Sequence, residues 1–131
     1  MHSKGRRPVA TVYSPKSAWR RQVGSTLRKH DYEPLEGAVE VVMFFRMPRP
    51  KSHYRSGRNA HLLRDDAPKL PKRADVDNLA KAVLDEMHGH AFHDDAQVTA
   101  LMVRKRYAVQ GEDPGVDLRW HSELPNTYFR E

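Results

Sequence analysis

Four aspartates that lie close together in this 131-residue chain are the residues best suited to chemistry. Asp75 and Asp77 flank a single valine, and Asp94 and Asp95 follow after sixteen intervening residues. Carboxylates are the oxygen ligands that Mg²⁺ and Mn²⁺ prefer. Three of them from two segments would hold one or two such ions, as at sites that cleave phosphodiesters. The alternative is a helix cap followed by an ordinary acidic turn, since exposed aspartates are common.

One lysine lies within this acidic cluster. Lys81 follows Asp77 by one helical turn, so both side chains are expected on the same helix face. It either forms an ion pair, with Asp85 as the exposed partner one turn further on, or directs its charge at a scissile phosphate. Three histidines that follow also permit a zinc site, although the polarity of a helix end and loop accounts for them equally well. They are His88, His90 and His93.

Charge is unevenly distributed along the chain. The net charge is +6, from 23 Lys and Arg against 17 Asp and Glu. Residues 74–95 hold six acids and one base, a net charge of −5, which leaves +11 for the rest. The basic part suits a polyanion such as nucleic acid. Acids beside a polyanion are tolerated when a divalent cation lies between them, so this pattern favours metal-dependent chemistry on a nucleic acid.

The elements expected to position these residues are two helices and four strands. Apolar residues recur at helical spacing after Ser14-Pro15, a typical helix start. The strand over residues 38–47 is apolar on both faces, which indicates a central position in a sheet. The order of elements predicts one small α/β (α+β) domain over residues 1–131, with a mixed sheet packed by two main helices. The expected elements are the strands Val9–Tyr13, Ala38–Met47, Gln97–Tyr107 and Val116–His121 and the helices 14–30 and Asp75–His88.

A long segment without periodicity, residues 49–73, joins the central strand to the second helix. It holds eight bases and two acids. Loops of this length in compact domains are usually functional or disordered. We interpret this segment as a mobile basic arm.

The segment Lys72–Val98 carries a specific run of motifs. A basic stretch leads into Asp75-Val-Asp77-Asn78-Leu-Ala-Lys81, a helix ends at Gly89, and Asp94-Asp95-Ala-Gln97-Val98 follows. This run resembles the RusA family of Holliday junction resolvases, and the long arm is most similar to its phage- and prophage-borne branch. Upstream, the segment Lys4-Gly5-Arg6-Arg7-Pro8 resembles the basic stretch that follows a leading strand in many members, and that strand is expected to be absent here.

This resemblance implies a small mixed α/β fold and a Mg²⁺-dependent endonuclease, with Mn²⁺ as a second possible ion. It implies a homodimer that binds four-way DNA junctions and nicks two strands symmetrically, in recombination and repair. The family's essential aspartates fall on Asp75, Asp77 and Asp95, which would hold the metal, and its essential lysine falls on Lys81. Asp94 matches a motif position without an assigned role.

The resemblance also suggests a function for the basic arm, which is to hold phosphates around the junction. The alternative is a disordered solubilising loop. Tyr54 either stacks on an unpaired base at the branch point or is a surface aromatic. The candidate DNA contacts are Arg49, Lys51, Arg55, Arg58, Lys72 and Arg73 in the arm, and Lys4, Arg6 and Arg7 near the N-terminus.

Two other functions are compatible with the residues alone. The first is a non-catalytic protein that binds branched nucleic acid, and the second is a metal-dependent RNase. The concentrated negative charge argues against the first, because a pure binder gains nothing from acids beside its ligand.

Several classes of protein are disfavoured by composition. The absence of cysteine excludes disulfides, thiolate zinc sites and cysteine nucleophiles, and it is consistent with a reducing compartment. The longest apolar run, Val41–Phe45, is far shorter than the roughly 18 residues of a membrane span. No apolar stretch follows the basic N-terminus, so no signal peptide is expected. The expected location is the cytoplasm of a bacterial or phage-infected cell.

Overall fold

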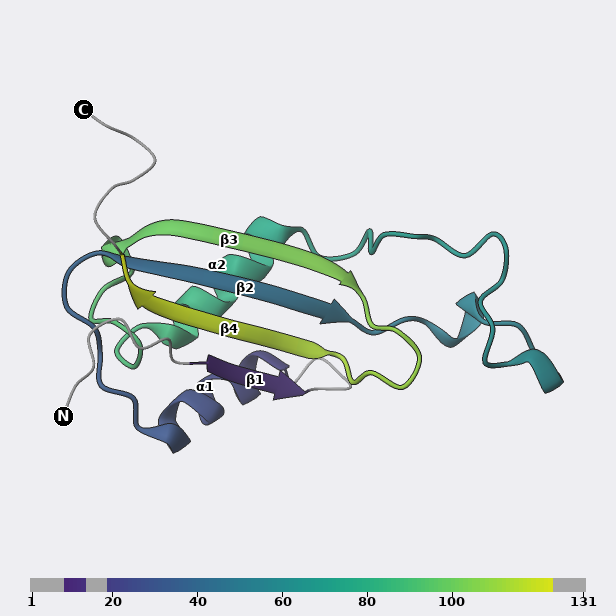
Figure 1. Cartoon of the computed structure of the whole chain (residues 1–131), viewed down its shortest axis with the longest axis horizontal. Coiled ribbons are helices and arrows are strands. Elements are labelled where there is room, and N and C mark those ends of the chain that lie inside the picture. Colours follow the sequence, from purple (N-terminus) through teal and green to yellow (C-terminus); the bar gives the residue numbers. More distant parts are fainter. Residues whose placement is uncertain (1–8, 14–18, 124–131) are drawn as a thin grey trace, which may run out of the picture.

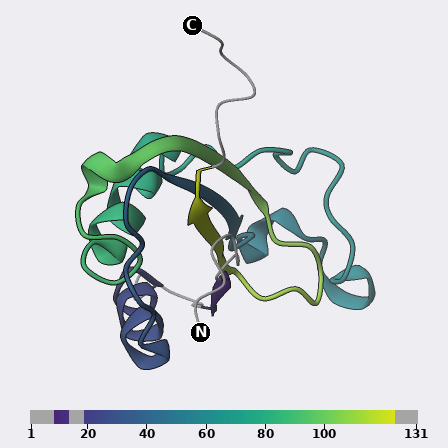
Figure 2. The same ribbon diagram turned by 60° about the vertical axis from the view of Figure 1, so that its left-hand side comes forward.

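A mixed four-stranded sheet forms the centre of the molecule. The computed structural model describes the backbone of residues 9–13 and all of residues 19–123. Strand order is β1-β4-β2-β3; β2 and β3 are parallel and the other neighbours are antiparallel. The helices lie together on one side of the sheet (Figures 1 and 2). The elements are β1 (Val9–Tyr13), α1 (Trp19–His30), β2 (Val39–Met47), α2 (Val76–Met87), β3 (Val98–Tyr107) and β4 (Gly115–Ser122).

The expected fold class is confirmed, with element boundaries that differ from the expected ones by a few residues. Three short 3-10 turns were not expected: two lie in the arm, at residues 51–53 and 57–59, and one lies at residues 95–97 before β3. The helix start expected at Ser14-Pro15, the candidate contacts Lys4, Arg6 and Arg7, and the missing leading strand all fall outside the described residues.

The core lies between the sheet and the two helices. Alternate residues of β2 are buried, and β2 lies between β4 and β3, as its two apolar faces predict. Trp120 on β4 and Phe92 in the loop after α2 are fully buried. Each helix contributes an apolar stripe, because its apolar residues recur every three or four positions. The buried helical side chains are Val23, Leu27, Leu79, Ala80, Val83 and Met87.

The contact between α1 and α2 combines a small residue with an ion pair. A Cβ added at Gly24 would lie 2.6 Å from a carboxylate oxygen of Glu86, so the glycine leaves room for this side chain. Arg20 reaches both Asp85 and Glu86 at 3.4 Å. The expected pairing of Asp85 with Lys81 is therefore wrong, because the neighbouring helix supplies a guanidinium that sequence spacing alone does not reveal.

The basic arm leaves the end of β2 and returns to the start of α2, projecting beyond the sheet (Figure 1). Its limbs are joined by an antiparallel bridge between Tyr54 and Leu63 and by a hydrogen bond from the Arg55 amide to the Leu62 carbonyl, at 2.8 Å. At its root, the Arg49 guanidinium lies 4.0 Å from the centroid of the Tyr107 ring. The mobility of the arm stays a prediction.

Candidate active site

The acidic pair lies at the mouth of α2, where the chain enters the crossover from β2 to the parallel strand β3. In such βαβ units, ligands bind beyond the carboxyl ends of the strands, next to the helix start. Asp75 occupies the N-cap position, but its side chain makes no capping hydrogen bond. Asp77 lies in the first turn and is exposed. Neither carboxylate has an ion-pair or hydrogen-bond partner among the described residues, so the capping alternative does not account for them.

An unusual backbone conformation precedes Asp75. Ala74 has a φ of 61°, in the left-handed region, which costs a residue with a side chain roughly 1–2 kcal/mol. The Lys105 ammonium of β3 donates to the Ala74 carbonyl oxygen at 2.9 Å. Such strain concentrates at functional sites, where the surroundings fix the conformation. Lys105 therefore supports the strained backbone immediately before Asp75.

The contact of Lys105 beside the acidic pair was not predicted from the sequence, although the strand period contained a signal for it. In the β2–β3 register, Lys105 pairs with Phe45, whose side chain is buried on the helix-covered face. Side chains alternate between the two faces of a strand, so Arg104 and Arg106 point to the opposite face. Of the three consecutive basic residues Arg104, Lys105 and Arg106, Lys105 is thus the one directed toward α2.

Lys81 lies one turn after Asp77 on the exposed face of α2. It makes no ion pair with any described residue, so the pairing alternative is not formed here. The end of its flexible side chain is free to approach an anion bound near Asp75 and Asp77. Asp77 and Lys81 thereby share one helix face, with Asp75 at the N-cap two residues before Asp77.

Asp95 lies at the other end of α2. It follows the loop that leaves the C-terminus of this helix, and the helix has 12 residues, which span about 18 Å. Its neighbour Asp94 accepts a hydrogen bond from the Ala96 amide at 2.9 Å, and this bond lowers the pKa of the Asp94 carboxyl. Asp94 therefore caps the turn before β3, whereas Asp95 is exposed.

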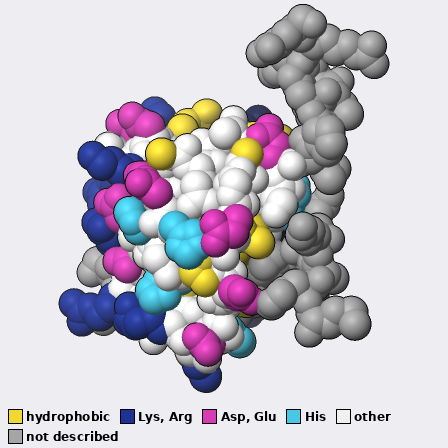
Figure 3. Space-filling view, turned by 90° about the vertical axis from the view of Figure 1, so that its left-hand side faces the viewer, with side chains coloured by type: hydrophobic (Ala, Val, Ile, Leu, Met, Phe, Trp, Pro, Cys, Tyr) yellow, Lys and Arg dark blue, Asp and Glu magenta, His cyan; other side chains and the backbone are white. Residues whose placement is uncertain are grey.

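A three-carboxylate cluster is not assembled within the part of the chain that the structure describes. Among residues 9–13 and 19–123, no group of three or more His, Asp or Glu side chains is arranged to hold a metal. The zinc alternative also finds no support, and His93 contacts Glu36 at 2.9 Å instead. Histidine and acidic side chains do gather at the end of the molecule where β3 begins (Figure 3). The structure thus places Asp75, Asp77 and Lys81 in the N-terminal part of α2 and Asp95 beyond its C-terminus.

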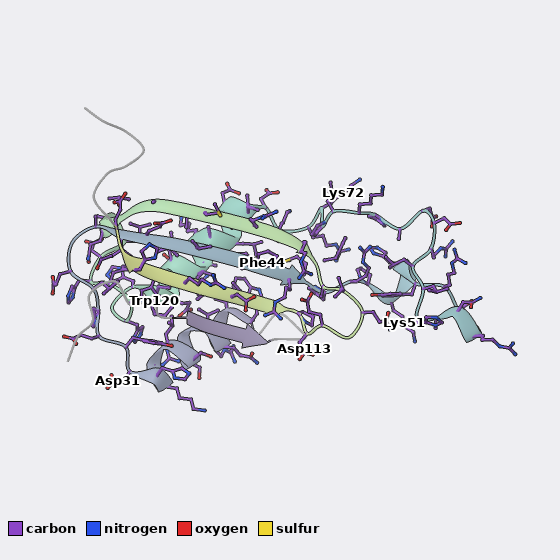
Figure 4. All side chains as sticks on the ribbon, viewed as in Figure 1. Asp31, Phe44, Lys51, Lys72, Asp113 and Trp120 are labelled. Carbon is purple, nitrogen blue, oxygen red and sulfur yellow. The ribbon has the colours of Figure 1, made fainter. Side chains whose placement is uncertain are left out.

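The candidate DNA contacts of the arm fall into two groups. Arg49 donates to the Pro68 carbonyl at 2.6 Å, and Arg55 donates to the Leu63 carbonyl and to Asp65, at 3.2 and 2.8 Å. These two arginines therefore hold the arm together. The remaining four are exposed and have no ion pair or hydrogen bond among the described side chains, and two of them are labelled in Figure 4. They are Lys51, Arg58, Lys72 and Arg73.

The domain combines a small mixed sheet, unpaired carboxylates and a lysine at the start of a helix, and a basic arm. This combination is typical of a nuclease that acts on a phosphodiester. The family model described as Endodeoxyribonuclease RusA matches residues 2–119, so the chain belongs to the RusA family. It is an endodeoxyribonuclease of the Holliday junction-resolving type, and its substrate class is branched DNA. Nucleases of this family generally depend on a divalent metal. No curated protein matches the chain. No helix in the described ranges has the length and apolar character needed to cross a bilayer.

Proposed function

We propose that this chain forms a homodimer that resolves four-way DNA junctions by two symmetric nicks, with Mg²⁺ or Mn²⁺ as its cofactor. The observation that carries this proposal is the division of the acidic residues between the two ends of α2. Asp75 and Asp77 are unpaired at one end, and Asp95 is exposed at the other.

A second copy of the chain would complete the site. Carboxylate ligands lie about 2.0–2.1 Å from Mg²⁺, so groups separated by the length of α2 cannot share one ion. In a twofold dimer, the same surface of each protomer contacts the other, and any shared site occurs twice. Each site would then contain Asp75, Asp77 and Lys81 of one protomer together with Asp95 of the partner subunit. Two such sites match the two strands cut at a junction.

The donor chemistry fits a hard divalent cation. Asp75 and Asp77 present exposed carboxylate oxygens without competing partners, as Mg²⁺ and Mn²⁺ require. When bound, such an ion polarises the phosphate and lowers the pKa of its water. Lys81 places its ammonium beside the developing negative charge. The free cations of the arm, such as Arg58 and Lys72, hold phosphates that flank the cut.

The test is a cleavage assay on four substrates: a mobile four-way junction, a flap, a linear duplex and a structured RNA. We expect Mg²⁺-dependent nicking of the junction above all others. The Asp75→Asn variant should lose cleavage yet keep junction binding, because it removes a ligand without adding repulsion to DNA. Asp85→Asn on the same helix is the matched control, since Asp85 pairs with Arg20 and should be dispensable for cleavage.

The outcomes separate the competing functions. An Asp75→Asn variant that cuts at the wild-type rate would refute the metal assignment. A protein that binds the junction and never nicks it would be the binding module, and one that prefers RNA would be the metal-dependent RNase.

A further inference from the structure

A cleft of about 270 Å³ lies between the root of the basic arm and the turn that joins β3 to β4. Arg49, Tyr54 and Ala60 line it from the arm, and Val109 and Gln110 line it from the turn. This volume lies just below the roughly 300–1,000 Å³ of sites for drug-sized ligands. The cleft therefore suits a ligand with a single flat ring system.

The two walls of this cleft are held in place independently. On the arm side, the Tyr54 amide donates to the Lys51 carbonyl at 3.1 Å, and the backbone of Tyr54 bridges to Leu63. On the turn side, the Ala108 amide donates to the Met47 carbonyl at 2.8 Å, and Glu112 binds the Arg106 guanidinium through both oxygens, at 2.6 and 2.9 Å. The cleft is thus built into the fold of both segments.

The lining combines an aromatic residue with an unused amide. Tyr54 is half-buried, and its side chain has no hydrogen bond within the described part of the chain. Gln110 is exposed and its amide makes no hydrogen bond to any described residue, so it can both donate and accept. The only acid in the lining, Glu112, is neutralised by Arg106. The lining also holds Arg49, whose guanidinium donates to the Pro68 carbonyl and lies over the Tyr107 ring. An aromatic platform, a free amide and aliphatic walls suit a heteroaromatic ring with a hydrogen-bonding edge.

The cleft lies at the same end of the sheet as the acidic pair. Lys105 contacts the Ala74 carbonyl next to Asp75, and Ala108 of the cleft follows three residues further along the chain. Three extended residues span about 10 Å. Exposed Lys51 and Arg58 on the arm supply positive charge beside the cleft for the phosphates of a DNA strand.

We propose that this cleft receives one unpaired nucleobase from the branch point of the junction, stacked on Tyr54 and hydrogen-bonded by Gln110. This inference rests on the proposed function, because it assumes a branched DNA substrate. It assigns the arm a second function beyond holding phosphates, since a base can enter the cleft only where the strands are not fully paired. The cleft thereby distinguishes a junction from a linear duplex.

Photo-crosslinking locates the base directly. A four-way junction that carries 5-iodouracil at its branch point is bound to the full-length protein without divalent metal and irradiated, and the digested adduct is mapped by mass spectrometry. We expect the adduct on Tyr54, within the tryptic peptide Ser52–Arg55. An adduct confined to other segments would overturn the proposal.

Affinity measurements test the energetic contribution of the stack. Tyr54→Ala should weaken junction binding about tenfold, within the range for one base–aromatic stack, and weaken linear-duplex binding less than about twofold. Tyr54→Phe should retain wild-type affinity. Gln110→Ala, which leaves the arm intact, should cost about threefold on the junction alone. Arg58→Ala is the matched control, because a lost phosphate contact weakens binding to both DNAs equally.

Each remaining outcome has a defined meaning. If Tyr54→Ala and Gln110→Ala weaken both DNAs equally, or neither, the base pocket is refuted while the proposed endonuclease function stands. If free nucleoside monophosphate in excess abolishes the crosslink, the cleft is a site for free nucleotides and the proposal falls. If the wild-type protein does not distinguish a junction from a duplex, both the pocket and the proposed function fail.

Discussion

Mixing two inactive variants tests whether each active site is shared between two chains. The variants are Asp75→Asn and Asp95→Asn, each of which should be inactive by itself. Because α2, which is about 18 Å long, lies between Asp75 and the loop that leads to Asp95, a shared site would take these two residues from different protomers.

The expected recovery follows from counting sites. Free exchange of equal amounts makes about half of the dimers mixed, by random pairing of protomers. In a mixed dimer, one site carries both substitutions, whereas the other combines the intact Asp75 of one protomer with the intact Asp95 of its partner. About a quarter of all sites are then complete, so nicking should return to about a quarter of the wild-type rate.

The assay is cleavage of a supercoiled plasmid with an extruded cruciform. A wild-type dimer cuts both strands and gives linear DNA, whereas a mixed dimer with one complete site gives open circles. The matched control mixes Asp75→Asn with Asp77→Asn, which alter the same half of the site and should not restore activity. If the first mixture also stays inactive, although both variants dimerise and bind junctions, each site is complete within one chain and the reasoning is refuted.

Two further predictions concern the supports of the site and the cleft. Lys105→Met should lower the cleavage rate about tenfold, because it removes a charged hydrogen bond to the Ala74 carbonyl. The Mg²⁺ concentration needed for half-maximal rate should rise, and junction affinity should stay unchanged. Lys105→Arg should restore part of the rate. Hydrogen bonds from Arg106 lower the pKa of Glu112 from 4.5 to about 2. The pair therefore stabilises the fold fully above pH 4.5, and this stabilisation is lost as the pH falls through about 2. Thermal unfolding of the wild type and Glu112→Gln should therefore differ at neutral pH and converge toward pH 2, and a constant difference would contradict the assignment.

The strands, helices and buried stripes follow from the sequence because burial imposes a period. The alternation over Val39–Met47 and the apolar spacing of Val23 and Leu27 have physical causes that operate locally. The same reasoning placed the acidic pair at the start of α2 and Lys81 one turn further on. The sequence also contains the reason for the separation of Asp95, because a helix of 12 residues lies between the two acidic groups.

Long-range contacts of polar residues were not predictable in this way. Nothing in the sequence around Arg49 indicates that its guanidinium reaches the Pro68 carbonyl, nineteen residues away. Alanine gives no sequence signal for a left-handed conformation, so the strain at Ala74 and its hydrogen bond from Lys105 follow only from the structure. The cleft also depends on two segments that are far apart in the chain, and no local period relates them.

The position of the arm inside the β2–α2–β3 crossover has a consequence for how proteins of this architecture diversify. The arm connects two elements whose ends are fixed by the sheet and the helix layer, so a change in its length leaves the strand register intact. Doubling a flexible loop costs only about 0.6 kcal/mol in closure entropy. Insertions and replacements at this point are therefore thermodynamically inexpensive, and they alter the surface that meets the DNA while the acidic pair stays in place. Substrate range and catalytic chemistry are in this way free to evolve separately.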